Sequence, residues 1–533
     1  MDQPPDPTPQ PSGSTRGDHV VSDQSVVFEF LGNPASHPDD GTVTRIDTHG
    51  AAVFLVGRDA YKVKRAVAFP FMDFSTLEKR RQACEAEIAI NRPAAPDLYL
   101  AALPVVRRNG KLHLGGDGDV VDWVVHMRRF DETQTLDRIA ETSALPEPLL
   151  GDLARAIVAA HAKAPRCAPD FDPVGALAEV LGDNAAAFAA APDLFPGAAA
   201  AALAEKAGAA LARYAPLLRA RAAAGNVRRC HGDLHLRNIA VIDGHPVLFD
   251  AIEFDPKLAT GDVLYDLAFL LMDLWERGLR RPANLVLNRY LWASDSLDAY
   301  GVLALVSLFL STRAGIRAKV GAAAAAGARG EDQMQVREAA RRYFEAACDF
   351  LRPSAPRLIA VGGLSGSGKS TLAAALAPSL GRAPGAVILR SDIERKAMAG
   401  VGETARLPST AYTQTATEAV YARLREKAAL ALQAGHSVIA DAVHARPDER
   451  AAIEAVAAHA GAAFTGIWLE APEAIRTERV SRRRVDASDA DAAVVAQQQS
   501  NDVGVMTWQV IDVSQGRSPA LAAARAVIED QPI

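Results

Sequence analysis

The sequence predicts two modules of different fold class, an α+β module followed by an α/β module built on a parallel sheet. Strand-like apolar runs come first and helices follow them in residues 26–351, whereas short strands and helices alternate from residue 357 onward. A proline-rich break, Arg-Pro-Ser-Ala-Pro, separates these patterns at residues 352–356. We therefore expect modules at 26–351 and 357–533, joined by a linker at 352–356.

Composition limits the classes of function. Among 533 residues, 58 Lys and Arg stand against 64 Asp and Glu, so the net charge of −6 argues against a chain-wide basic surface for nucleic acid. The four dispersed cysteines suit a reducing cytoplasm. The best candidate for a membrane span, 299–312, has 14 uncharged residues before Arg313, which is too short to span a membrane and predicts a buried helix. Prolines in residues 1–25 predict a disordered tail without a secretory signal.

The first module begins with a predicted sheet. Its strands are expected at 26–31, 51–57, 60–67, 98–106 and 120–130, with one helix inserted at 76–92. An alanine-rich helical region over 136–225 follows, then a motif-dense stretch over 230–266 and further helices to about residue 351. This order of strands before helices is typical of an α+β fold.

The motif-dense stretch carries a phosphotransfer pattern. His231-Gly-Asp233 stands five residues before Asn238, and Asp250 follows an apolar strand. This spacing places a base and a metal ligand on one loop, with a second carboxylate at a strand end. The set resembles the aminoglycoside phosphotransferase branch of the protein-kinase-like superfamily. That resemblance implies that Asp233 is the catalytic base, that Asn238 and Asp250 hold Mg²⁺, and that His231 and Asp266 brace the loop.

The same resemblance implies a lysine for the nucleotide phosphates and a glutamate partner. The strand AYKVKR offers Lys62 or Lys64, and the following helix offers Glu85 or Glu87. We prefer Lys62, and for its partner we prefer Glu87, because apolar Ile88 and Ile90 lie next to Glu87 as on a core-facing turn. The glycine-rich loop expected above the phosphates is reduced to three residues, 48–50.

A glycine-rich loop opens the second module. Residues 363–370 match GxxxxGK[ST] between an apolar strand and a helix, the context in which such a loop cradles phosphates. Its lysine neutralises phosphate oxygens and its serine can hold Mg²⁺. The residues expected to contact the nucleotide are Gly363, Ser365, Gly366, Ser367, Gly368, Lys369, Ser370 and Thr371.

Downstream of this loop the chain resembles small P-loop kinases of the gluconate-kinase, polynucleotide-kinase and zeta-toxin type. The resemblance implies that Asp392 orients or deprotonates the acceptor hydroxyl and that Asp441 contributes to the Mg²⁺ site. Arg479 and Arg483 would belong to an arginine lid over the phosphates. The chain has Asp441-Ala-Val where such kinases often have Asp-Ala-Thr.

Together these resemblances imply a cytoplasmic protein that uses ATP and Mg²⁺ to phosphorylate a hydroxyl of a small molecule. One alternative is a kinase for nucleic-acid 5′-hydroxyls or nucleotide sugars, against which the net charge argues. The other is an ATP-dependent switch in which one module is inactive, suggested by the reduced loop at 48–50. The sequence leaves the acceptor and the oligomeric state open.

Overall fold

The computed structural model describes residues 20–38, 41–48, 50–69, 72–327, 329–482, 487–498 and 503–530. The chain divides into two compact units. One unit extends to Glu276 and resumes over Leu308–Leu351, and the other contains Arg277–Ser307 and the chain from Arg352 onward. The predicted α+β module followed by an α/β module with a parallel sheet is confirmed.

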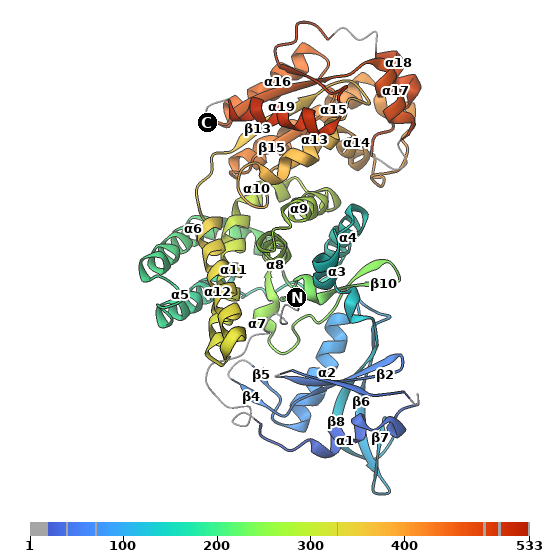
Figure 1. Ribbon diagram of the computed structural model, residues 1–533, viewed down its shortest axis with the longest axis vertical. Coiled ribbons are helices and arrows are strands. Elements are labelled where there is room, and N and C mark those ends of the chain that lie inside the picture. Colours follow the sequence, from blue (N-terminus) through green and yellow to red (C-terminus); the bar gives the residue numbers. More distant parts are fainter. Residues whose placement is uncertain are drawn as a thin grey trace. The chain divides into compact units, whose positions relative to one another are not determined.

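A six-stranded antiparallel sheet opens the first unit, in the order β1-β2-β3-β8-β6-β7. Its strands are β1 (Thr44–Asp47), β2 (Ala51–Val56), β3 (Asp59–Lys64), β6 (Tyr99–Arg108), β7 (Lys111–Leu114) and β8 (Asp119–Arg128), and a hairpin of β4 (Ala68–Phe69) and β5 (Met72–Asp73) lies apart from it. Helix α2 (Leu77–Asn91) lies beside this sheet (Figure 1). Its Cys84 and Ile88 pack with Leu55 and Val125 in one apolar core.

The first predicted strand is a helix. Residues 26–31 lie in α1 (Ser25–Gly32), because Val27 and Leu31 share one helical face and pack on Phe54 and Val63 of the sheet. The predicted disordered tail is also wrong at its end. Gln24 is buried and its side chain bonds the backbone of Lys64 and Ala66, so the ordered chain reaches further toward the N-terminus.

Helices form the rest of the first unit. The predicted helical region 136–225 comprises four helices: α3 (Leu136–Thr142), α4 (Glu147–Lys163), α5 (Pro173–Ala190) and α6 (Gly197–Ala223). The motif-dense stretch forms two small antiparallel pairs, β9 (Val227–Arg229) with β12 (Thr260–Asp262), and β10 (Ile239–Ile242) with β11 (His245–Leu248). The remaining helices are α7 (Pro256–Ala259), α8 (Val263–Glu276), α11 (Val306–Gly327) and α12 (Gly330–Phe350).

The second unit is a parallel sheet in the order β14-β15-β13-β16-β17. Its strands are β13 (Arg357–Gly362), β14 (Val387–Arg390), β15 (Val438–Asp441), β16 (Ala463–Glu470) and β17 (Gln509–Asp512). The helices are α13 (Lys369–Leu376), α14 (Ser391–Met398), α15 (Gln414–Gln433), α16 (Pro447–His459), α17 (Glu473–Ser481), α18 (Ala492–Gln498) and α19 (Arg517–Glu529). Between Arg357 at the start of β13 and Asp441 at the end of β15, the residues of these two central strands are apolar or glycine and buried, because helices cover the sheet on both faces (Figure 1).

The second unit also contains two helices that precede residue 352, α9 (Arg280–Ser294) and α10 (Asp298–Gly301). We had placed them in the first module, 26–351, on sequence pattern. Their packing groups them with the parallel sheet, because three side chains of α9 bond the backbone near β14. After these helices the second unit resumes at Arg352.

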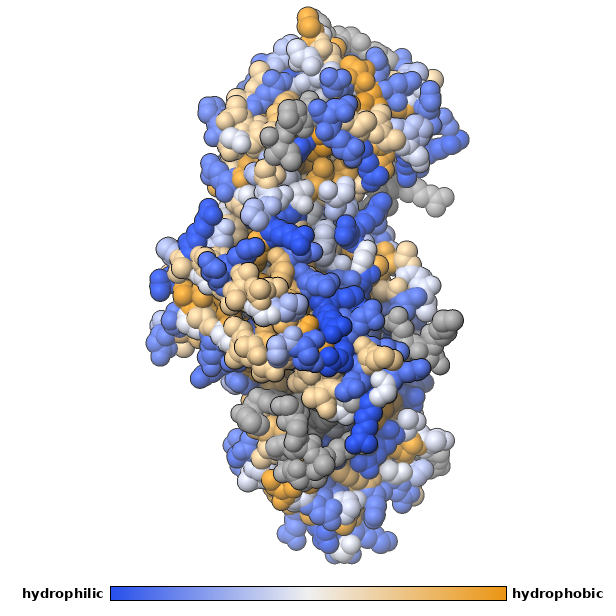
Figure 2. All heavy atoms as spheres, turned by 60° about the vertical axis from the view of Figure 1, so that its left-hand side comes forward, coloured by the Kyte–Doolittle hydropathy of each residue, from blue (hydrophilic) through white to orange (hydrophobic). Residues whose placement is uncertain are grey.

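One segment, Asp298–Gly327, is long and apolar enough to cross a membrane by composition alone. In the fold, 72% of its most apolar window is buried, as in the core helix of a globular protein. It includes the run 299–312 for which the sequence predicted a buried helix. On the face drawn in Figure 2, hydrophilic and hydrophobic residues are interspersed over the described surface.

Candidate active sites

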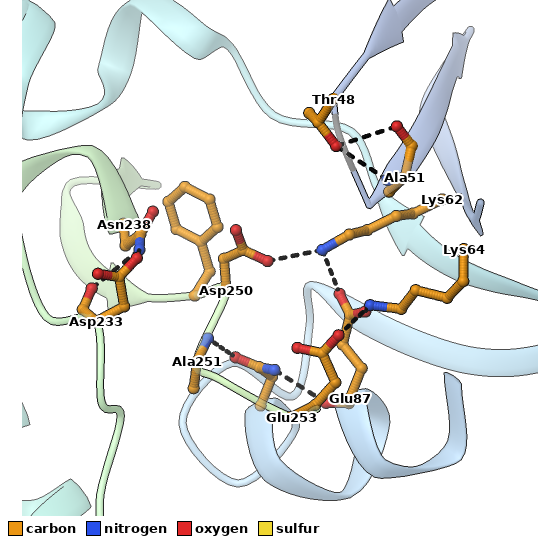
Figure 3. A network of polar contacts seen from close by, with 12 residues as sticks. Thr48, Ala51, Lys62, Lys64, Glu87, Asp233, Asn238, Asp250, Ala251 and Glu253 are labelled. Carbon is orange, nitrogen blue, oxygen red and sulfur yellow. Dashed lines mark hydrogen bonds and ion pairs between the residues drawn. The ribbon is translucent and has the colours of Figure 1, made fainter. Parts of the chain in front are cut away.

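The first site begins with two lysines on one face of β3. Because side chains alternate along a strand, Lys62 and Lys64 both point toward α2, while Tyr61 and Val63 enter the opposite core. Glu87 of α2 is fully buried and meets both of them (Figure 3). Its Oε1 lies 2.9 Å from Lys62 Nζ, and its Oε2 lies 2.5 Å from Lys64 Nζ. Glu85, the other candidate partner, is exposed and pairs with Arg81.

The second contact of each lysine distinguishes them. Lys62 Nζ lies 2.7 Å from Asp250 Oδ1, so it joins Glu87 to the expected metal ligand. Lys64 pairs instead with Glu253 and is almost completely buried. Burial alone would lower the pKa of Lys62, but Asp250 and Glu87 raise it well above its ordinary value. Lys62 therefore remains a cation at the open side of the network, where 16% of its side chain is exposed.

Glu253 was not singled out from the sequence. Burial raises its pKa, although Lys64 acts in the opposite direction. It stands three residues after Asp250, and 189 residues separate it from its partner Lys64. The sequence offers one signal for Glu253, namely that it is a second acid close to the predicted metal ligand. The residues next to position 253 give no indication that its side chain is buried.

The loop from His231 to Asn238 holds the expected base. Asn238 Nδ2 donates to the Asp233 carboxylate at 3.0 Å and to its backbone carbonyl at 2.9 Å. His235 Nε2 lies 3.3 Å from the same carboxylate. Burial raises the pKa of Asp233, but the charge and hydrogen bond of His235 outweigh it, so the net pKa falls below the ordinary range. Asp233 is therefore held as an ionised carboxylate that accepts hydrogen bonds.

Buried contacts brace this loop. His231 Nε2 lies 2.8 Å from the Phe249 carbonyl, next to Asp250. Asp266 accepts a hydrogen bond of 2.8 Å from the Gly232 amide and pairs with His161 at 3.1 Å. Gly232 has a φ of +81°, and a Cβ there would lie 3.1 Å from Ala259. His231 and Asp266 thus both hold the start of this loop, one through the Phe249 carbonyl and the other through the Gly232 amide.

Asp250 lies where a metal ligand would be needed. Its backbone is left-handed, with φ +61°, and its amide donates to the Tyr99 hydroxyl at 2.9 Å. Its side chain is 46% exposed, in contrast to buried Glu87. Figure 3 shows Asp250 between Lys62 and the pair of Asp233 and Asn238. Carboxylate and amide oxygens are the ligands that Mg²⁺ takes in proteins, so the residues present fit this ion.

The short loop above this site is also defined in part. Thr48 Oγ1 bonds the carbonyl and amide of Ala51 at 3.0 Å each and closes the turn between β1 and β2. At Gly50 a Cβ would lie 2.8 Å from Met72, so only glycine fits without rearrangement. His49 lies outside the described residues.

The second site centres on the glycine-rich loop between β13 and α13. Gly363, Gly366 and Gly368 have φ values of +137°, +83° and +96°. A Cβ on Gly363 would lie 2.6 Å from the Leu469 carbonyl, and one on Gly366 would lie 2.6 Å from that of Arg476. These positions require glycine for space as well as for φ. Lys369 is the first residue of α13, so the loop ends at a helix N-terminus, where anions are favoured.

The side chains of this loop fit a nucleotide and a cation. Lys369 Nζ contacts the Leu364 carbonyl at 3.3 Å and thus reaches back over the loop. Ser370 and Thr371 follow in the first turn of α13, while Ser367 is buried. The Ser365 amide donates to Gln498 Oε1 at 2.8 Å. Gln498, which sequence reasoning missed, thus connects α18 to the loop.

Two acids lie beside the loop at strand ends. Asp441 ends β15, is buried, and pairs with Arg390 at 3.3 Å. Asp392 follows β14 in the first turn of α14. Burial, together with Asp441, raises the pKa of Asp392, and the opposing charges of Arg390 and Lys369 do not cancel this shift. Arg390 was not predicted, although it is the register partner of Asp441 on the neighbouring strand.

Helix α17 supplies arginines beside the glycine-rich loop. Arg479 Nη1 contacts the Ser367 carbonyl at 3.4 Å, and its Nη2 donates to the Val513 carbonyl at 2.7 Å. Buried Arg476, which we had not predicted, contacts the Ser365 carbonyl at 3.4 Å. Arg483, the other predicted lid residue, lies outside the described residues.

Comparisons with known proteins match each half separately and the chain as a whole. A family model described as phosphotransferase enzyme family matches residues 56–301, and one described as AAA domain matches 358–501. An uncharacterized protein of Mycobacterium tuberculosis H37Rv is 31% identical over 500 residues, which cover 92% of this chain and 96% of that protein. The relative therefore shares both halves in the same order.

Two solved structures were also matched. An ethanolamine kinase of Plasmodium vivax is 10% identical, covering 62% of this chain and 91% of that chain, with a TM-score of 0.39. A gluconokinase from Sinorhizobium meliloti 1021 is 21% identical, covering 33% of this chain and 97% of that chain, with a TM-score of 0.24.

Proposed function

We propose that this chain transfers the γ-phosphoryl group of ATP to a hydroxyl of a small molecule at each of two sites. The chain belongs to the family of fusions between a phosphotransferase-family module and a P-loop kinase module. Kinase-type modules are present in both halves. The contact of Lys62 with both Glu87 and Asp250 carries the proposal for the first half. It joins a phosphate-binding cation to a metal-binding carboxylate.

In the first site, Lys62 would bind phosphate oxygens while Glu87 keeps its ammonium group oriented. Asn238 and Asp250 would hold Mg²⁺, which when bound supplies charge neutralisation at the phosphates. Asp233 would accept the proton of the acceptor hydroxyl at its carboxylate. Its depressed pKa keeps the carboxylate ionised for that step.

In the second site, the amides of the glycine-rich loop and Lys369 would bind the phosphates of ATP, while Ser370 and Asp441 would hold Mg²⁺. Asp392 would orient or deprotonate the acceptor. Arg479 would stabilise charge that develops during transfer, since it already lies against the loop.

Single-site variants test this proposal. With γ-labelled ATP and a metabolite library, we expect the wild type to form two sets of labelled products. Asp233→Asn should lose one set and Lys369→Ala should lose the other. Glu85→Gln is the matched control, since Glu85 lies on the same helix as Glu87 but pairs only at the surface with Arg81. Wild-type turnover that persists in the double variant would refute both active-site assignments. Labelling of 5′-hydroxyl oligonucleotides alone would favour a nucleic-acid kinase.

A further inference from the structure

Helix α9 covers the outer edge of the parallel sheet. Strand β14 is an edge strand, paired with β15 on one side. The carbonyls of Ala386 and Ile388 and the amide of Ile388 are bonded by side chains of α9 instead of by another strand. Open strand edges are usually covered, but here the cover is a ladder of specific hydrogen bonds.

Three side chains make this ladder. Asn284 Nδ2 donates to the carbonyls of Pro384 and Ala386 at 3.0 Å each. Asn288 accepts from the Ile388 amide at 2.7 Å and donates to the Ala386 carbonyl at 3.3 Å. Trp292 Nε1 donates to the Ile388 carbonyl at 3.0 Å.

The spacing of the two elements explains the match. Residues 284, 288 and 292 lie four apart, so each step along the helix rises about 6.0 Å. Residues 386 and 388 lie two apart, and such a step in a strand advances about 6.6 Å. Pro384 lies in the turn before β14, which begins at Val387. The intervening Val387 amide donates to the Ser437 carbonyl, toward β15. One face of a helix thus replaces an edge strand.

This ladder acts on the strand that leads to Asp392. Arg390, two positions after Ile388, ends β14 and pairs with Asp441. Asp392 follows immediately in α14. Asn284 and Asn288 are each only 2% exposed, so loss of the Asn288 amide leaves the Ile388 amide of this strand without its partner in a dry environment. A second contact, between Arg289 and Glu403, joins α9 to the loop that follows α14.

We infer that Asn288, with Asn284 and Trp292, is a positioning residue for the second site, holding β14 so that Asp392 faces the phosphate loop. This inference rests on the proposed function of that site. Residues 280–294 fall within the match to the phosphotransferase family, 56–301, so sequence belonging to one module completes the fold of the other. The phosphate loop itself follows β13, which β15 separates from β14. Acceptor positioning should therefore change without an equal change in nucleotide binding.

The test uses the full chain with Asp233→Asn, so that ATP turnover reports the second site. In Asn288→Ala we expect hydrogen exchange at the Ile388 amide to rise and kcat to fall, each about tenfold or more, while the KM for ATP stays within about twofold. Trp292→Phe keeps an aromatic side chain, loses one donor, and should give a smaller change in the same direction. Trp292→Phe also tests the inference if Asn288→Ala does not fold.

Asn184→Ala is the matched control. This buried asparagine of α5 donates to the Thr312 carbonyl at 3.3 Å, and both residues belong to the first unit. We expect wild-type kcat and wild-type Ile388 exchange in this variant. Unchanged Ile388 exchange in Asn288→Ala, or the same loss of kcat in Asn184→Ala, would overturn the inference. If the second site shows no ATP turnover even without a ladder substitution, the proposed function and the positioning role are both refuted. Hydrogen exchange at the Ile388 amide in Asn288→Ala would still show whether the ladder exists.

Discussion

Lys62 and Lys64 bind opposite oxygens of one buried carboxylate, that of Glu87. Lys62 continues to Asp250 at the open side of the site, and Lys64 continues to Glu253 in the interior. The two lysines are therefore chemically alike but differ in their second partner. We assign nucleotide binding to Lys62 and support of the network to Lys64.

This division predicts different losses in Lys62→Met and Lys64→Met. In a Lys369→Ala background, Lys62→Met should reduce phosphoryl transfer by about 10²-fold, because a cation at the transferring phosphate is removed. Lys64→Met should lower the free energy of unfolding by about 3–5 kcal/mol, because Glu253 is left buried without its partner. Thermal unfolding and labelled-phosphate transfer measure the two effects. A Lys64 variant with wild-type stability and no activity would contradict the assignment.

The metal assignment predicts a loss of cation binding in Asp250→Asn. In the same background, Mn²⁺ bound together with ADP should show an affinity at least about tenfold lower, because a neutral amide replaces a charged oxygen ligand. Electron paramagnetic resonance of Mn²⁺ measures this directly, without any acceptor. Asp243→Asn is the control, since Asp243 is exposed and faces Arg128 at 3.6 Å. Equal Mn²⁺ affinity in both variants would exclude Asp250 as a ligand.

Local spacing accounts for what the sequence predicted in these sites. The two-residue period of a strand puts Lys62 and Lys64 on one face and leaves the choice between them open, and Asn238 lies on the same loop as Asp233, five residues away. The glycine-rich loop has a similar local origin, because its conformation depends on a few adjacent residues.

Features that depend on distant partners were missed. The bond between Ile388 and Asn288 joins positions 100 apart, and that between Lys64 and Glu253 joins positions 189 apart. Periodicity reports which face of an element is buried but not which element covers it. For this reason the sequence pattern places α9 in the first module, although it belongs to the second unit. The apolar residues 26–31 are likewise predicted as a strand, although they form a helix.

The arginines of α17 predict a contrast between neighbours. Arg479→Ala should reduce ATP turnover of the second site by about tenfold or more, since Arg479 contacts the phosphate loop. Arg482→Ala is the matched control, because Arg482 is 80% exposed and pairs with Glu478 on the same helix, a contact worth about 0.5 kcal/mol or less. Turnover in an Asp233→Asn background measures both. Equal losses would indicate a general effect of positive charge and not a specific contact.

The two proposed bases predict different acid limits for the two reactions. The pKa of Asp233 lies below its ordinary value, whereas burial holds that of Asp392 above it. A base must be ionised to act, so activity of the second site should fall at a higher pH than activity of the first. The rate of phosphoryl transfer is measured against pH in Lys369→Ala, which reports the first site, and in Asp233→Asn, which reports the second. Each variant is given the acceptor of its remaining site, and the two profiles give the two acid limits. The reverse order would contradict the base assignments.

The same shift predicts how stability depends on pH. Because the folded state favours neutral Asp392, the stability from this preference is fully present below the ordinary pKa of about 3.9 and is lost as pH rises through the raised value. Asp392→Asn is neutral at every pH and escapes this loss. Its free energy of unfolding, relative to the wild type, should therefore increase from pH 4 to pH 7, as measured by urea denaturation. A difference that stays constant over this range would show that Asp392 does not titrate in a buried environment.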